Sequence, residues 1–239
     1  MNMLIPKQHG AWAMLVIPYV LGMVKGGVVW WHLPLAVGWL FLYLVAYPLT
    51  MLVKKRQMDV YKKWAVRYGV VAACFLLPVV WMYPPLLLLG SLLFPLFLVM
   101  MMYARKNDDR AFLNDLVAVV IFSAAGLASY WLGAERLDEW ALFIFGQTML
   151  FFVGSAFYVK SMIREKNNRW FARYSWVYHV LAPCLSLAMG AGWAVLALIP
   201  SSIRAWVLYG KKLSIMRIGI YEVINASFFL LVISSFLLW

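Results

Sequence analysis

The side chains that could do chemistry are few, and most lie at one set of ends of long apolar segments. The chain has nine acidic residues and three histidines among its 239 residues. Asp108, Asp109 and Asp115 flank the start of one apolar segment, and Glu222 lies near the start of another. Ionisable groups are costly within a membrane, so those near helix ends are natural functional candidates. Together with neighbouring lysines and arginines, these carboxylates could bind an anionic or diphosphate-like ligand.

Asn114 and Asp115 allow two interpretations. They open the apolar segment at 112–132. An amide and a carboxylate in that position can cap the free N–H groups and offset the positive end of the helix dipole. The same two side chains could instead contribute to a site, and the sequence leaves both alternatives open.

Glu222 and Asn225 lie three residues apart, so they share one face of a helix. A carboxylate inside a membrane helix needs a partner, because an isolated charge there is expensive. Arg217, Lys160 and His179 are the partners we expect. Structural pairing and a functional role are equally compatible with this pattern.

His9 and Trp12 lie at the mouth of the first apolar segment and extend the set of candidates. No standard metal, nucleotide or acyl-transfer motif occurs, so no catalytic residue and no metal ligand is assigned. If one site exists, His9, Asp115, Lys160 and Glu222 should converge on a single cavity; separate salt bridges would argue against it. The candidate ligand-binding residues are His9, Trp12, Tyr103, Lys106, Asp108, Asp109, Asn114, Asp115, Lys160, Arg164, His179, Glu222 and Asn225.

The elements that must position these residues are transmembrane helices. Hydrophobic residues make up 66% of the chain, charged residues 13%, and the mean hydropathy is +0.84. Continuous apolar runs favour helices over a barrel, whose strands would alternate apolar and polar residues. We predict an all-α, polytopic transmembrane bundle in a single domain, residues 1–239. The predicted segments are 9–24, 33–53, 65–82, 86–103, 112–132, 140–161, 174–189, 193–209 and 218–238.

The run from 174 to 209 is too long for one crossing, and Gly190 and Gly192 offer a break. With this break and a cytoplasmic N-terminus, all but two of the 21 lysines and arginines lie on the cytoplasmic side. The exceptions are Lys25 and Arg136. This distribution follows the positive-inside rule and places the C-terminus outside. The cationic loops are expected at 54–64 and 162–173, with shorter ones elsewhere.

Residues 6–12 (PKQHGAW) and Pro18 resemble the opening of the YwiC-like family of bacterial membrane proteins. The resemblance continues through residues 107–111 (NDDRA), 159–165 (VKSMIRE) and 219–222 (GIYE), and so runs over essentially the whole chain. It implies a location in a bacterial membrane and does not imply a particular chemistry.

A weaker resemblance, at the level of topology, is to UbiA-type membrane prenyltransferases. Those enzymes have nine helices, a cytoplasmic-facing site and a tyrosine followed by a basic residue after the fourth helix, similar to residues 103–106 (YARK). They hold Mg²⁺ on a prenyl diphosphate with two aspartate-rich motifs, since Mg²⁺ prefers oxygen ligands. This chain departs from that pattern, because the corresponding loops carry only Asp59 and Glu165.

Three functions therefore stay open. The first is a YwiC-like protein with a cytoplasmic-facing cavity for a lipidic or anionic ligand, such as an isoprenoid or a diphosphate. The second is a divergent prenyltransferase that uses Asp108, Asp109 and Asp115 beside Lys106 and Arg110. The third is a small transporter or an accessory subunit of a membrane complex.

The expected surroundings follow from composition and charge. We expect a multi-pass protein of the bacterial cytoplasmic (inner) membrane, in contact with the bilayer and with anionic lipid headgroups at its cytoplasmic face. A net charge of +12 could indicate nucleic-acid binding in a soluble protein, but no soluble domain is present to carry it. No cofactor is expected, except Mg²⁺ in the prenyltransferase alternative.

Overall fold

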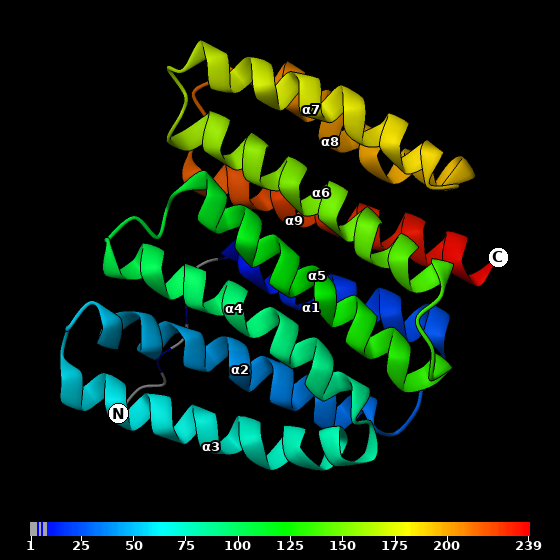
Figure 1. The fold of residues 1–239 in the computed structure, drawn as a ribbon. Helices are drawn as coiled ribbons and strands as arrows, with labels where there is room; N and C mark the ends of the chain where they lie inside the picture. Colours follow the sequence, from blue (N-terminus) through cyan, green and yellow to red (C-terminus); the bar gives the residue numbers. More distant parts are fainter. Residues whose placement is uncertain (1–3, 5, 7–8) are drawn as a thin grey trace.

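The computed structural model describes residue 4, residue 6 and residues 9–239. Over these residues the chain forms nine α-helices and one 3₁₀ helix, with no β-strand (Figure 1). The elements are α1 (His9–Gly26), α2 (His32–Val53), α3 (Met58–Met82), α4 (Pro85–Arg105), α5 (Phe112–Ala134), α6 (Glu139–Ile163), α7 (Arg169–Ala188), η1 (Gly192–Leu198), α8 (Ile199–Val207) and α9 (Ile215–Leu238). The predicted all-α bundle is confirmed, with η1 and α8 together forming the eighth segment.

The helices lie roughly parallel to one another in a flattened bundle that is two helices deep over much of its width (Figure 1). α1 packs on α5, α9 contacts α6 and α8 contacts α7, while α2 and α3 pair at the opposite edge. α6 contacts α5, α7, α8 and α9, so it joins the middle of the bundle to the α7–α9 edge. From this central place α6 contributes side chains to both polar clusters described below.

Close backbone contact holds α1 against α5. A Cβ atom added at Gly22 would overlap the backbone oxygen of Gly126, and one at Gly133 would overlap the backbone oxygen of Gly27. Membrane helices gain stability mainly from such packing, because lipid tails are as apolar as the side chains and supply no hydrophobic drive to association. These glycines therefore allow the backbones of α1 and α5 to approach each other closely near the centre of the bundle.

Two helices begin at least five residues earlier than the sequence predicts. α3 starts at Met58 rather than residue 65, and α7 starts at Arg169 rather than residue 174. Their first turns are rich in charged residues and were therefore expected to be loop. The charged turns instead continue the helix into the polar region, and Asn168 caps α7 by accepting hydrogen bonds from the backbone N–H groups of Trp170 and Phe171.

The predicted break between the seventh and eighth segments lies where expected. Gly190 and Gly192 have φ angles of +82° and +50°, which are accessible to glycine and unfavourable for other residues. The chain then runs as a 3₁₀ helix before Pro200 in the first turn of α8. A 3₁₀ helix rises ~2.0 Å per residue and an α-helix ~1.5 Å, so η1 and α8 together span roughly 27 Å. That is close to the thickness of a bilayer's hydrocarbon core.

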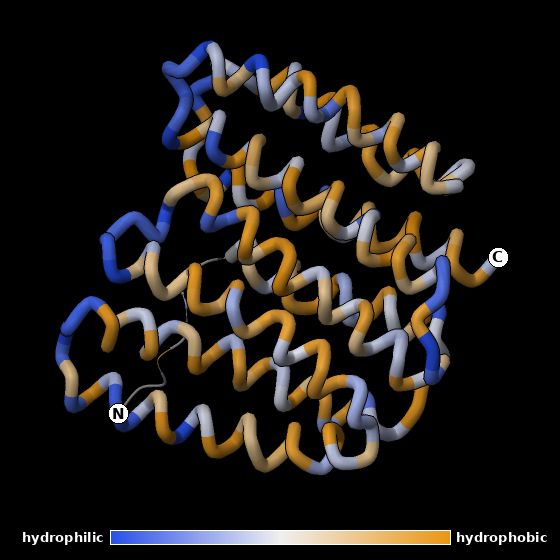
Figure 2. Tube along the Cα trace, in the orientation of Figure 1, coloured by the Kyte–Doolittle hydropathy of each residue, from blue (hydrophilic) through white to orange (hydrophobic). Residues whose placement is uncertain are grey.

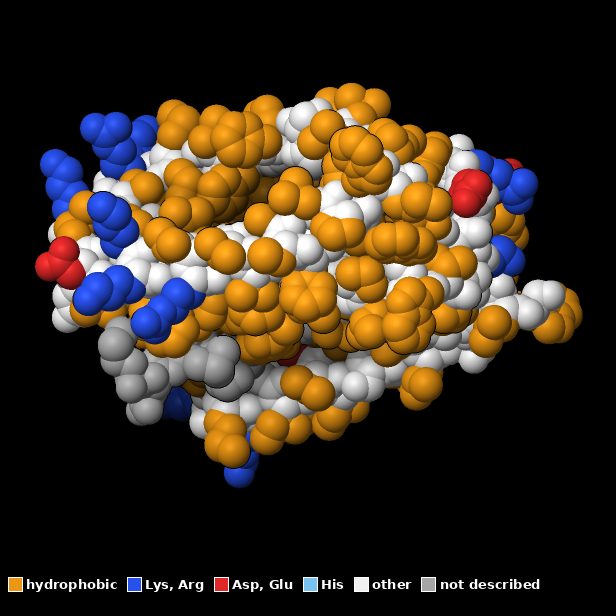
Figure 3. All heavy atoms as spheres, turned by 90° about the horizontal axis from the view of Figure 1, so that it is seen from below, with side chains coloured by type: hydrophobic (Ala, Val, Ile, Leu, Met, Phe, Trp, Pro, Cys, Tyr) orange, Lys and Arg blue, Asp and Glu red, His pale blue; other side chains and the backbone are white. Residues whose placement is uncertain are grey.

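Polar residues concentrate at the ends of the bundle, and apolar side chains cover its middle. Figure 2 shows hydrophilic loops between α2 and α3, α4 and α5, and α6 and α7 gathered at one end. In Figure 3, lysines and arginines crowd the same end, and hydrophobic side chains form a broad band beside it. Among the described residues, six helices are long and apolar enough to cross a membrane: α2, α3, α4, α5, α6 and α9. The chain is therefore a multi-pass membrane protein.

Candidate functional site

Two clusters of polar side chains stand out in the fold, one at the cation-rich end and one deeper in the bundle. We call the first the loop cluster; it consists of Lys54, Asp109, Arg110, Asn114, Asp115, Lys160 and Arg164. We call the second the buried cluster; it consists of Ser155, Tyr158, Ser201, Arg204, Glu222 and Asn225.

Lys160 is the central residue of the loop cluster. Its Nζ lies 3.1 Å from Asp115 Oδ2 and donates a hydrogen bond to the backbone oxygen of Arg110. Arg164 Nη1 donates to the same oxygen over 3.3 Å. The last turn of α6 thereby holds the loop between α4 and α5 against the start of α5.

Asp109 and Asn114 tie the same loop to a third element. Lys54 Nζ, at the end of α2, lies 2.7 Å from Asp109 Oδ1, and Asn114 Nδ2 donates to the backbone oxygen of Asp109 over 2.8 Å. Burial raises the pKa of Asp109, but the hydrogen bond and charge of Lys54 outweigh it and hold the pKa below its ordinary value. Of the two alternatives for Asn114 and Asp115, a side-chain cap is not found, because α5 begins at Phe112 after Ala111 without one; Asp115 nevertheless lies in the first turn, near the positive end of the helix dipole.

The buried cluster is built around an ion pair between Arg204 Nη1 and Glu222 Oε1. Ser155 Oγ donates to Glu222 Oε2, and Arg204 Nη2 donates to Ser155 Oγ over 3.4 Å. The partner expected for Glu222 was Arg217, Lys160 or His179, and that expectation is wrong. Arg204 reaches Glu222 from α8, whereas the side chain of Lys160 points from α6 toward α5.

Two further contacts complete the buried cluster. The guanidinium carbon of Arg204 lies 4.3 Å from the ring centroid of the fully buried Tyr158, a cation–π arrangement that is strongest away from water. Asn225 Nδ2 donates to Ser201 Oγ over 2.8 Å. Arg204 Nε and Asn225 Oδ1 are buried and have no hydrogen-bond partner in the described chain. An unpaired buried polar atom is costly, so these two atoms mark a position where a partner would be stabilising.

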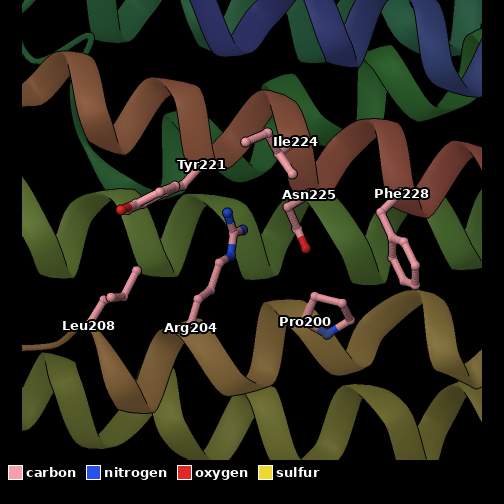
Figure 4. Close-up of a pocket in the computed structure, with 7 residues that line it drawn as sticks. All are labelled: Pro200, Arg204, Leu208, Tyr221, Ile224, Asn225 and Phe228. Carbon is pink, nitrogen blue, oxygen red and sulfur yellow. The ribbon is translucent and has the colours of Figure 1, made fainter.

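A groove of about 320 Å³ runs between α8 and α9 beside this cluster. Figure 4 shows Arg204 extending from α8 toward α9, and Asn225 extending from α9 into the same gap. The remaining walls are apolar or aromatic. The lining residues are Pro200, Arg204, Leu208, Tyr221, Ile224, Asn225 and Phe228. Small-molecule sites typically combine mostly apolar walls with a few convergent polar groups, and this groove has that composition.

Comparison with known proteins identifies the family. The family described as YwiC-like protein matches residues 5–130. A Bacillus subtilis (strain 168) protein named Uncharacterized protein YwiC is 56% identical over 237 residues, covering 99% of both chains. The chain belongs to the YwiC-like family. A Haemophilus influenzae protein (strain ATCC 51907 / DSM 11121 / KW20 / Rd) named Uncharacterized protein is 36% identical over 237 residues, covering 98% of both chains.

No solved structure matches this YwiC-like chain, so its resemblance to UbiA-type enzymes stays a prediction. The positions of Asp108, Asp109 and Asp115 do not form the shared acidic site that the prenyltransferase alternative requires. Asp109 and Asp115 each pair with a different lysine, and Asp108 is exposed. Within the described residues, no three His, Cys, Asp or Glu side chains lie close enough together to hold a metal ion.

The remaining candidates do not join either cluster of this YwiC-like protein. His179 is buried between α6 and α7; its Nδ1 donates to the backbone oxygen of Ser175 over 2.7 Å. Trp12 packs edge-on against Tyr43, with ring centroids 5.3 Å apart. Tyr103 is partly exposed and Lys106 is exposed. The side chain of His9 lies outside the described part of the chain.

The residues that would converge if one site exists do not do so among the described side chains: Asp115 and Glu222 form separate salt bridges, the outcome that argues against a single site. Lys160 and Asp115 belong to the loop cluster, and Glu222 and Asn225 belong to the buried cluster. Sequence reasoning missed Arg204, which it counted among the cations that set topology. The sequence did carry a signal for Arg204, which is its isolation in an apolar stretch. It lies between Ile203 and two further apolar residues, whereas the next cations along the chain lie beyond residue 209.

Proposed function

We propose that this YwiC-like protein binds an amphipathic lipid in the groove between α8 and α9, with the polar head of the lipid at Arg204. The observation that carries the proposal is that Arg204, only 7% exposed, lines the groove and keeps Nε without a partner. Arginine inside a membrane segment is expensive and is usually retained for a function. A lipid head that accepts from Nε would satisfy this donor.

The position of the groove fits a lipid. Ser155, which contacts the Arg204–Glu222 pair, lies eight residues before the end of α6 at Ile163, or about 12 Å along a helix. Arg204 would thus lie below the headgroups, within the cation-rich half of the membrane. The groove follows α9 from Tyr221 to Phe228, about two turns, and its outer wall includes Ile224, which is 61% exposed on the apolar surface. A hydrocarbon chain could enter from the bilayer without crossing a polar surface.

The orientation belongs to the same proposal. The cation-rich end would face the cytoplasm, as the positive-inside rule requires, and would contact anionic lipid headgroups. The membrane would be the bacterial cytoplasmic membrane. The buried cluster then lies in the cytoplasmic half of the protein, and the proposed binding involves no metal ion and no nucleic acid.

Lipid retained by the purified protein tests the proposal. The protein would be extracted in a mild detergent, and its bound lipids compared with the bulk extract by mass spectrometry. We expect one class of lipid to be enriched at roughly one molecule per chain. Ile224→Trp should fill the groove and remove that enrichment. Val223→Trp is the matched control, because Val223 is similarly exposed on α9 but does not line the groove.

Two results would contradict this function. One is a wild-type protein that carries no lipid above the proportion found in the bulk extract. The other is equal lipid retention by Ile224→Trp and Val223→Trp, both shown to be folded by their thermal unfolding. Either result would mean that the groove is a packing defect or that it contacts bilayer lipids without selecting one.

A further inference from the structure

The charge of the groove limits which lipid heads it can accept. Arg204 is the only charged residue among the seven that line it, and Glu222 already pairs with that arginine. The described groove therefore offers no uncompensated positive charge. A diphosphate or phosphate head carries negative charge and needs several charge-assisted hydrogen bonds when it leaves water. An anionic head would have to compete with Glu222 for a single guanidinium group.

The free hydrogen-bonding atoms limit the head further. Arg204 Nε carries a hydrogen that no described atom accepts. Asn225 donates to Ser201 through Nδ2, and its Oδ1 accepts no hydrogen bond from the described chain. Both side chains are more than nine-tenths buried. Both point into the gap between α8 and α9 (Figure 4). Two side chains that line the groove thus carry one unpartnered donor and one unpartnered acceptor.

We infer that the lipid recognised here ends in an uncharged hydroxyl group, as a long-chain isoprenoid or acyl alcohol does. A hydroxyl oxygen accepts from Arg204 Nε while its hydrogen is donated to Asn225 Oδ1, so one head satisfies both buried atoms. The apolar remainder of the groove, with Ile224 and Phe228 on its walls, takes the hydrocarbon chain. This inference rests on the proposed function and specifies the class of its ligand.

Three probes with the same chain separate the head chemistries: farnesol, farnesyl methyl ether and farnesyl diphosphate. Each would be titrated into the delipidated full-length protein in detergent, and binding followed by native mass spectrometry. We expect farnesol to bind, and the methyl ether, which cannot donate, to bind about tenfold more weakly. Farnesyl diphosphate should bind at least as weakly as the ether. Diphosphate binding equal to or tighter than that of farnesol would overturn the inference, as would equal binding of farnesol and its ether.

A variant ties the preference to the residue. Asn225→Leu removes the acceptor and should abolish the advantage of farnesol over its methyl ether. Ser227→Leu is the matched control, since Ser227 is exposed on the same helix and does not line the groove. Persistence of the full advantage in folded Asn225→Leu would overturn the assignment. Tight binding of the diphosphate would leave the lipid-binding function standing, whereas failure of all three probes and absence of co-purified lipid would contradict that function as well.

Discussion

The loop cluster and the buried cluster each contain a lysine or arginine paired with a carboxylate, but they differ in access to water. In the loop cluster the side chain of Lys160 is 9% exposed and that of Asp115 is 36% exposed. In the buried cluster Arg204 and Glu222 are 8% and 14% exposed. Water can therefore solvate Asp115 when its partner is lost, while Glu222 and Arg204 depend on each other. The same chemical pairing thus fixes a loop in one region and shapes a cavity in the other.

One helix serves both clusters. Lys160 points from α6 toward α5, and Ser155 points from α6 toward α9, where it contacts Glu222. The two residues lie five positions apart, which places them on different faces of a helix with 3.6 residues per turn. The difference in exposure therefore comes from the depth along α6 and the neighbours on each face.

The largest expected effect comes from leaving Arg204 without its partner. Glu222→Gln should lower the free energy of unfolding by about 3–5 kcal/mol, because an unpaired buried charge has no water to solvate it. Reversible unfolding in mixed micelles, followed by tryptophan fluorescence, would measure the change. Glu139→Gln, at an exposed position on α6, is the control and should change stability by less than about 0.5 kcal/mol.

A double variant sharpens this result. In Arg204→Met with Glu222→Met both charges are gone, so stability should return to near the wild-type value. Lipid enrichment should nevertheless be lost, because the donor at the groove is removed. A loss of stability in the double variant as large as in Glu222→Gln would mean that packing, rather than an isolated charge, dominates the buried cluster.

The comparison between the clusters also shows where sequence reasoning succeeded in the fold. The nine segments followed from apolar run lengths, and the break at Gly190 followed from the excessive length of its run and was supported by the distribution of cations. The start of α3 at Met58 was missed because a charged amphipathic turn resembles a loop in composition. Helix ends in the polar region depend on capping and on neighbouring loops, which hydropathy does not report.

The candidate sites were less predictable than the fold. Asp115, Lys160, Glu222 and Asn225 were correctly recognised as polar residues on helices, but their partners depend on which helices pack together. Arg204 reaches Glu222 because the break at Gly190 turns the chain back, so that η1 packs against α9 and α8 faces α9 across the groove. Long-range pairing of that kind leaves no spacing pattern in one sequence, so the sequence could only pose convergence on one cavity as a condition, and the structure has two separate clusters instead.

An intermediate effect is expected in the loop cluster. Lys160→Met removes the hydrogen bond to the backbone oxygen of Arg110 and the ion pair with Asp115, and should lower stability by about 1–2 kcal/mol. Adding Asp115→Asn should recover part of the loss. The control is Lys106→Met, at an exposed position of the same loop region. A loss of 3 kcal/mol or more for Lys160→Met would erase the contrast with the buried cluster.

The smallest effect is expected at the outer edge of the loop cluster. Asp109→Asn removes an ion pair with Lys54 in which the Asp109 side chain is 34% exposed, and should lower stability by about 0.2–1 kcal/mol at neutral pH. Asp108→Asn, an identical change at the exposed neighbouring residue, should have no measurable effect.

The stability difference between wild type and Asp109→Asn should depend on pH, and this dependence is a sharper test than the size of the difference. The pKa of Asp109 lies below its ordinary value of 3.8, so the folded protein binds its proton less readily than the unfolded chain does. The contribution of Asp109 to stability should therefore be fully present above about pH 5 and decline as the pH falls through 3.8 and then through the lowered pKa. Wild type and Asp109→Asn should converge in stability at the acidic end of that range. A difference that stays constant down to pH 3 would show that Asp109 acts through packing, and that the loop cluster resembles the buried one more than its exposure indicates.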